Sequence, residues 1–136
     1  MQQESQDQPI TSPVFMIVDD DPLMVHALSN ALRPLGKVTF STEFDQVHLM
    51  AAITRPRILL IDIDLPEVTG LEIVRRINAN SDLDDSHVFL MTAHRSASVL
   101  NQVEGLRIDG LLIKPIDMVA LISRMEGILG THRGPG

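Results

Sequence analysis

Acidic side chains follow directly on two apolar segments of the chain. Asp19 and Asp20 come after the apolar residues 14–18, and Asp62 and Asp64 stand at the end of a second apolar segment. Two carboxylates held about 4 Å apart repel each other by roughly 4 kcal/mol at an effective dielectric near 20. If the fold brings these acids together, either the pKa of one of them rises or a cation binds between them.

The donor set indicates which cation and which reaction such a cluster would serve. Acids with neither His nor Cys beside them favour a hard ion, and Mg²⁺ keeps waters and shares phosphate oxygens, with Asp20 and Asp62 as candidate direct ligands. A carboxylate can also attack phosphorus and form an acyl phosphate. That transfer needs positive charge and a hydroxyl beside the phosphoryl oxygens. Lys114 and Thr92, which end two other apolar segments, supply an ammonium and a hydroxyl.

Five short apolar segments alternate with five segments of helical periodicity. The apolar segments are residues 14–18, 38–41, 58–61, 88–91 and 111–113, and the helical ones are residues 22–35, 44–55, 71–77, 99–106 and 118–129. Asp21 and Pro22 are the expected cap and first residue of the first helix. Because each right-handed crossover between parallel strands needs a helix, this alternation predicts an α/β fold. We expect a single doubly wound five-stranded parallel sheet in the flavodoxin-like order 2-1-3-4-5, with helices on both faces.

In that strand order the first and third strands are neighbours, and all strands end at one edge of the sheet. Asp19, Asp20 and Asp62 should therefore converge at this edge. Thr92 and Lys114 end the fourth and fifth strands and should lie along the same edge. The sequence thus predicts one polar site assembled from residues far apart in the chain.

Composition excludes several other kinds of protein. The 136 residues are 44% hydrophobic, which is enough for one core, and the lack of Cys excludes a disulfide scaffold, a thiolate zinc site and a cysteine nucleophile. With 11 basic against 18 acidic residues and only 3% aromatic residues, direct binding of nucleic acid is not expected. No apolar run has the length of a membrane span, so no contact with a membrane and a cytoplasmic location are expected.

The two ends of the chain differ from its middle. Residues 1–13 are polar and are expected to form a disordered tail. Residues 14–129 carry all the periodic segments and are expected to form the one domain. Residues 130–136 contain three Gly and one Pro and are expected to be a linker or a flexible end.

Four short motifs of the sequence resemble those of the receiver domains of bacterial two-component response regulators, of the chemotaxis-regulator-like kind. The motifs are Val18-Asp19-Asp20, Leu60-Ile61-Asp62 with Leu65-Pro66 and Gly70, Met91-Thr92-Ala93, and Lys114-Pro115. They stand in the family's order and spacing within residues 14–129. The resemblance implies an Mg²⁺-dependent phosphoprotein, and a signalling domain that catalyses only its own phosphoryl transfer and autodephosphorylation.

The resemblance also implies a role for each site residue. Asp62 would be the phosphoacceptor and a metal ligand, Asp20 a direct metal ligand, Asp19 an outer ligand acting through water, and Asp64 a ligand through its backbone carbonyl. Lys114 would pair with the phosphoryl group.

The resemblance also implies how the domain would respond to phosphorylation. Thr92 would move its hydroxyl onto the phosphoryl group, and the Lys114-Pro115 bond is expected to be cis. Leu111 occupies the position of the family's usual aromatic switch residue, and Ile116 that of the common aromatic after Lys-Pro. Rotation of an aromatic ring therefore cannot report phosphorylation here. His94, like Asp64, falls at a position where the family varies and tunes dephosphorylation.

The resemblance implies partners as well. A sensor histidine kinase, or a phosphotransfer protein in a phosphorelay, would donate the phosphoryl group. The added charge would rearrange the loops after the third and fourth strands and the face formed by the fourth helix, the last strand and the last helix. That face would bind an output domain, a partner protein or, in a phosphorylation-dependent homodimer, a second copy of the chain.

Two other functions use similar residues. The pair Asp62 and Asp64 resembles the paired aspartates of haloacid-dehalogenase-type phosphatases, but those enzymes carry the nucleophile on the first core strand and an acidic pair after the Lys. A receiver-like binding module that accepts no phosphate is the other alternative. The complete set of Asp20, Asp62, Thr92 and Lys114 argues against it.

Overall fold

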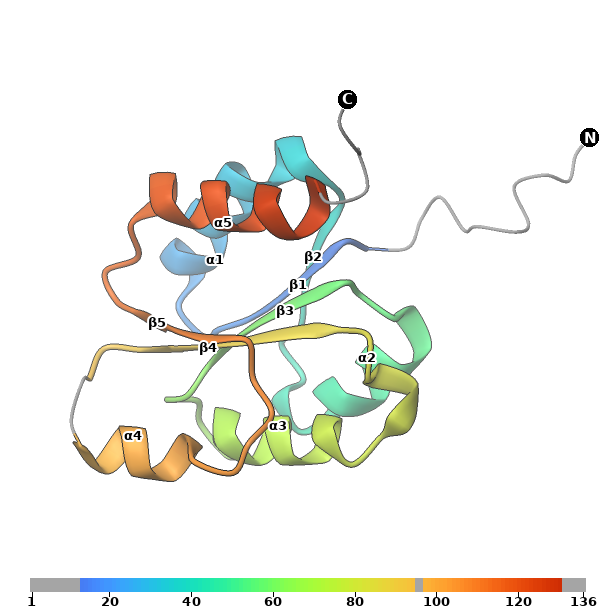
Figure 1. Cartoon of the computed structure of the whole chain (residues 1–136), viewed down its shortest axis with the longest axis vertical. Helices are drawn as coiled ribbons and strands as arrows, with labels where there is room; N and C mark the ends of the chain where they lie inside the picture. Colours follow the sequence, from blue (N-terminus) through green and yellow to red (C-terminus); the bar gives the residue numbers. More distant parts are fainter. Residues whose placement is uncertain (1–12, 95–96, 131–136) are drawn as a thin grey trace, which may run out of the picture.

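Five parallel strands form one sheet in the order β2-β1-β3-β4-β5 (Figure 1). The computed structural model describes residues 13–94 and 97–130, so most of the expected tail and linker lies outside the described residues. The strands are β1 Phe15–Val18, β2 Val38–Phe40, β3 Ile58–Asp62, β4 His87–Thr92 and β5 Gly110–Ile113. The predicted fold class and strand order are confirmed.

Helices cover both faces of the sheet. They are α1 Pro22–Leu32, α2 Val47–Thr54, α3 Gly70–Asn78, α4 Ala97–Val103 and α5 Met118–Gly130, with 3₁₀ turns η2 Arg33–Leu35, η3 Phe44–Gln46 and η4 Ser81–Leu83. Helices α1 and α5 lie on one face, and α2, α3 and α4 lie on the other (Figure 1). Among the described residues, no helix has both the length and the apolarity to cross a membrane.

The three central strands, β1, β3 and β4, are buried on both sides because alternate side chains enter two separate clusters. From β1, Phe15 and Ile17 pack with α1 and α5, whereas Met16 and Val18 pack with α2 and α3. All four side chains are buried. The continuous apolar runs of the sequence thus correspond to strands held between two helical layers.

Two helical segments end differently from the sequence expectation. The first helix tightens into a 3₁₀ turn at Arg33–Leu35, where Pro34 cannot donate a backbone hydrogen bond. Helix α4 ends at Val103, just before Gly105, whose φ is +89°. The polar segment after α3 contains the 3₁₀ turn η4, in which Leu83 is buried.

Capping fixes the two helices that start beside the sheet edge. The side chain of Asp21 accepts from the backbone N–H of Leu23 at 3.0 Å, with Pro22 in the first turn, as predicted. Thr69 Oγ1 accepts from the N–H of Glu72 at 3.2 Å and caps α3. Both helices therefore begin immediately beyond the strand ends that carry the acids.

Gly70, the first residue of α3, packs directly on the end of β3. A Cβ atom at this position would lie 2.2 Å from the carbonyl oxygen of Asp62, which no real Cβ contact allows. The Gly70 N–H also donates to the carbonyl of Ile63 at 3.0 Å. Helix α3 can therefore approach the strand this closely only because residue 70 has no side chain.

We predict that Gly70→Ala lowers the free energy of unfolding by about 3 kcal/mol, because the added methyl must displace backbone rather than a flexible side chain. Gly127→Ala is the matched control. A Cβ at Gly127 meets no atom within 4 Å, so this helical substitution should gain up to about 1 kcal/mol. Urea unfolding measures both changes, and equal effects of the two substitutions would contradict the close approach of α3 to β3.

Candidate functional site

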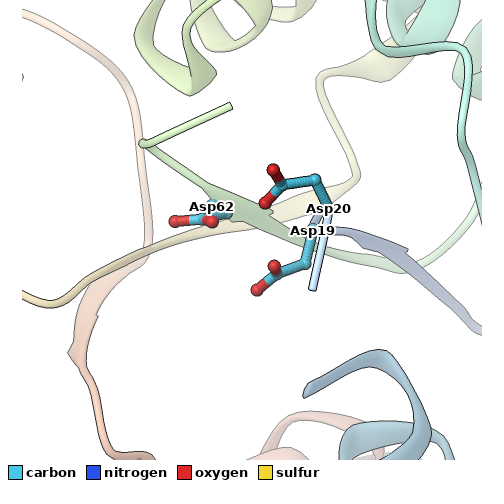
Figure 2. A group of neighbouring side chains, drawn as sticks. All are labelled: Asp19, Asp20 and Asp62. Atoms are coloured by element: carbon cyan, nitrogen blue, oxygen red, sulfur yellow. The ribbon is translucent and has the colours of Figure 1, made fainter. Parts of the chain in front are cut away.

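Three carboxyl groups converge where β1 and β3 end. Val18 pairs with Ile61 in the sheet, so Asp19 and Asp20 come beside Asp62. Asp19, Asp20 and Asp62 each offer a carboxylate oxygen, and these three oxygens lie within 4.8 Å of one another (Figure 2). Asp19 and Asp62 are buried, and Asp20 is exposed. The convergence expected from the strand order is therefore present.

Lys114 offsets the charge of the two buried acids. Its Nζ lies 2.9 Å from Asp19 Oδ2 and 3.3 Å from Asp62 Oδ2. The backbone N–H of Lys114 donates to the carbonyl of Thr92 at 2.7 Å, and the Lys114-Pro115 peptide bond is cis. The Lys114 ammonium, at the end of β5, thus contacts the acids at the ends of β1 and β3.

Backbone donors hold the remaining oxygens of these two acids. Asp19 Oδ1 accepts from the N–H of Asp21 at 2.9 Å, and Asp62 Oδ1 accepts from the N–H of Asp64 at 3.2 Å. Each acid therefore bonds to the backbone two residues ahead and to Lys114 with its other oxygen. These two turns were not predicted, although Asp residues commonly form such turns with the backbone two residues on.

The surroundings of Asp62 make it hard to ionise. Burial, and then the negative charge of Asp19, raise the pKa of Asp62 to about 6, against the opposing effects of Lys114 and the Asp64 N–H. Burial acts to lower the pKa of Lys114, but the hydrogen bond to Asp19 and the charges of both acids outweigh it and raise this pKa. The ammonium consequently stays charged, while Asp62 is held in a destabilised ionised form near neutral pH.

Thr92 ends β4 and is buried. Its Oγ1 accepts from the backbone N–H of His94 at 3.0 Å, and within the described ranges no hydrogen bond joins the Thr92 side chain to Asp62 or Lys114. The structure places Thr92 on the strand next to Asp62, since Asp62 pairs with Met91. Its hydroxyl is therefore at the same sheet edge but engaged elsewhere.

Three other predicted residues lie around this centre. Asp64 is exposed, and its carboxylate stands apart from the three clustered acids. Leu111 on β5 is half-buried against the cluster on the α2–α4 side, and Ile116 packs with the cluster of α1 and α5. Aliphatic side chains thus pack at both positions where the sequence comparison expected aromatic rings.

Comparison with known proteins gives the family. A family model for the response regulator receiver domain matches residues 15–126. The chain therefore belongs to the response regulator receiver family, whose members act in two-component signalling, and it is such a phosphoacceptor domain. The comparisons lend no support to a haloacid-dehalogenase-type phosphatase.

Individual relatives span most of this chain. A chemotaxis protein CheY homolog of Campylobacter jejuni is 24% identical over 125 residues, which cover 90% of this chain and 96% of the homolog. The transcriptional regulatory protein PrrA of Mycobacterium leprae is 31% identical over 127 residues, covering 90% of this chain and 52% of PrrA. This chain thus spans about half the length of that regulator.

A solved structure shows the same fold. Chemotaxis protein CheY4 of Vibrio cholerae superposes with a TM-score of 0.75 at 20% sequence identity, covering 84% of this chain and 96% of CheY4. The two chains therefore share the fold that the alternation of strands and helices predicted.

We predict that Asp62→Asn stabilises the metal-free chain at pH 8 by about 2 to 3 kcal/mol, because the amide removes an ionised group that is buried beside Asp19. The folded pKa near 6 exceeds the unfolded value of 3.8. The destabilisation by the ionised carboxylate is therefore complete above pH 6 and disappears as the pH falls towards 3.8, and the gain from the substitution should fade with it.

Urea unfolding in EDTA at pH 8 and at pH 4.5 tests this expectation. Asp64→Asn is the control, since its exposed carboxylate should change stability by less than about 0.5 kcal/mol at either pH. A stabilisation by Asp62→Asn that is the same at both pH values would show that burial beside Asp19 does not perturb Asp62.

Proposed function

We propose that Asp62 is the residue that accepts the phosphoryl group. The observation that carries the proposal is the position of its buried carboxylate, 3.3 Å from the Lys114 ammonium and grouped with Asp19 and Asp20 at the end of the sheet. Buried acids with a strongly perturbed pKa and a defined charge partner are typical of reactive sites. Phosphorylation of the intact chain by acetyl phosphate, with and without Asp62→Asn, tests the assignment.

The chemistry follows from these contacts. A carboxylate oxygen of Asp62 attacks phosphorus, and the bond from phosphorus to the nitrogen of a phosphohistidine, or to the oxygen of a small acyl phosphate, breaks as the aspartyl phosphate forms. The leaving group departs with the electron pair of the broken bond. Lys114 already contacts Asp62 Oδ2 and is placed to offset the charge that the phosphoryl oxygens bring.

A divalent cation fits the donor set. All three clustered groups are carboxylates, and the one exposed member, Asp20, also borders a cavity of about 550 Å³ between α1 and η3. We propose that Asp20 and Asp62 ligate Mg²⁺ directly, Asp19 through water, and Asp64 through its backbone carbonyl. Bound there, Mg²⁺ would offset negative charge on the acids and on the incoming phosphoryl group.

Thr92 is the candidate link between the site and the rest of the domain. Its hydroxyl now accepts the N–H of His94, in the loop that leads from β4 towards α4. If Thr92 Oγ1 turns to a phosphoryl group on Asp62, the His94 N–H loses that acceptor and the loop is free to shift. Leu111 on β5 adjoins this region and would have to pass the shift on by aliphatic packing alone.

The partners follow from the class of domain. We propose that a sensor histidine kinase or a phosphotransfer protein of the cytoplasm donates the phosphoryl group. The face of α4, β5 and α5 would pass the change to an output domain, a partner protein or a second copy of the chain. We further propose that the catalysis by the domain is limited to its own phosphorylation and autodephosphorylation, with the exposed Asp64 and His94 beside the site affecting the second rate.

Incubation with acetyl phosphate and Mg²⁺ should add the mass of one phosphoryl group to the intact chain, and Asp62→Asn should abolish the adduct. Asp21→Asn is the matched control, because Asn also caps a helix and the three clustered acids stay intact. Intact-mass spectrometry at neutral pH measures all three proteins. An adduct that survives Asp62→Asn would assign the phosphoacceptor to another residue.

Substitution of the exposed acid Asp20 should lower the affinity for Mg²⁺ without unfolding the chain. We predict that Asp20→Asn lowers the Mg²⁺ affinity at least tenfold, measured by isothermal titration calorimetry, because one of the proposed direct ligands loses its charge. Asp21→Asn is the control, since Asn also caps a helix and leaves the clustered acids intact. Equal affinities of the Asp20 and Asp21 variants would remove Asp20 from the metal site.

A further inference from the structure

Helix α2, Val47–Thr54, is apolar on nearly all sides although part of it faces solvent. The helix contains no Asp, Glu, Lys or Arg. Val47 and Ala51 face the core, whereas the exposed fractions of Leu49, Met50 and Ile53 are 49%, 43% and 77%. A helix that is hydrophobic all round is normally covered by other protein.

The exposed apolar surface continues onto the sheet. Phe40, at the end of the edge strand β2, is 56% exposed, and Phe40 and Met50 line one groove of about 310 Å³ between β2 and α2. Leu49 and Ile53 follow on the same side of the helix, because residues four apart are neighbours on a helix surface. We call Phe40, Leu49, Met50 and Ile53 the β2–α2 patch.

Charged residues flank this patch with opposite sign at its two ends. Lys37 precedes β2, and Arg55 follows α2, which runs back along the sheet; both therefore lie at the end where the strands begin. A hydrogen-bond chain supports this placement: the N–H of Val14 donates to the Lys37 carbonyl, and the Val14 carbonyl accepts the N–H two residues after Arg55. Glu43 and Asp45 lie between β2 and α2, at the opposite end. Asp45 also pairs with Arg76, and Arg55 with Asp82, so these two residues contribute less to the contrast in charge.

The charges at the two ends of the β2–α2 patch are complementary to those of a second copy rotated by half a turn. A two-fold axis through the centre of the patch would set the positive end of one copy against the negative end of the other, and would do so twice. The apolar side chains of both copies would then meet in the middle, where the chain has no charge. For a protein with a net charge of -7, such a surface also avoids bringing acids together.

We propose that the β2–α2 patch is a self-association surface, on which a second copy of this chain packs across a two-fold axis with β2 and α2 antiparallel to their counterparts. The edge of β2 stays available for this packing, because β2 pairs only with β1 among the described strands. The four apolar side chains of two copies expose on the order of 800 Å² together, which suits a weak, reversible dimer. The proposal is independent of phosphorylation at Asp62.

Sedimentation velocity of the unphosphorylated chain, over a range of concentrations, tests the association. We expect a monomer–dimer equilibrium with a dissociation constant of roughly tens of micromolar, and Ile53→Asp should weaken it at least tenfold. Val119→Asp is the matched control: Val119 is 80% exposed, about as much as Ile53, but it lies on α5. Circular dichroism and thermal unfolding check that each variant is folded.

A charge exchange tests the orientation. Lys37→Glu and Glu43→Lys should each weaken the dimer, because each sets like charges against each other across the axis. The double variant K37E/E43K keeps the net charge of the original chain and should restore association, since the exchanged charges again face opposite partners. A mixture of the two single variants should form the mixed dimer in preference to either symmetric one.

Three results would overturn the proposal. A chain that remains monomeric at several hundred micromolar has no such surface. Association that resists Ile53→Asp but is lost in Val119→Asp places the contact on another face. Association that Ile53→Asp weakens but the double charge exchange does not restore excludes the antiparallel packing.

Discussion

The ammonium of Lys114 lies between two buried carboxylates that end neighbouring strands of the sheet. Without it, Asp19 and Asp62 would each be a buried charge facing another of the same sign, at a cost of several kcal/mol. With it, the two buried acids keep one excess negative charge and the exposed Asp20 adds a second. Burial and the charge of Asp19 still raise the pKa of Asp62, although Lys114 opposes them. The charge of the site is therefore neutralised only in part, which leaves the site attractive to a cation and the ionised carboxylate of Asp62 high in energy.

The fold brings these residues together from separate parts of the chain. Asp19 follows β1 and Asp62 ends β3, and both strands are buried, so the backbone positions of these two acids are set by the core rather than by a loop. The caps Asp21 and Thr69 then start the next helices within a few residues. Rigid positions for a reactive group come here from the most stable part of the molecule.

The strand order and the meeting of the acids could be predicted because a parallel α/β chain allows few arrangements. Other features depend on contacts that the sequence alone does not specify. Met50 follows the helical apolar period, yet it is exposed, because α2 turns only Val47 and Ala51 into the core. The hydrogen bond from the His94 N–H to the Thr92 hydroxyl is another such contact. The residue types alone do not show whether this hydroxyl bonds to the following loop or to the acids at the same sheet edge.

The absence of a side chain at Gly70 has a mechanical meaning. Helix α3 packs against the carbonyl of Asp62 with no side chain between them, so Asp62 and the start of α3 are expected to move together. Asp62 pairs with β4 in the sheet, and Thr92 at the end of β4 accepts a hydrogen bond from the N–H of His94. A structural change that starts at Asp62 is therefore expected to shift β4 and the residues after it rather than helix α3.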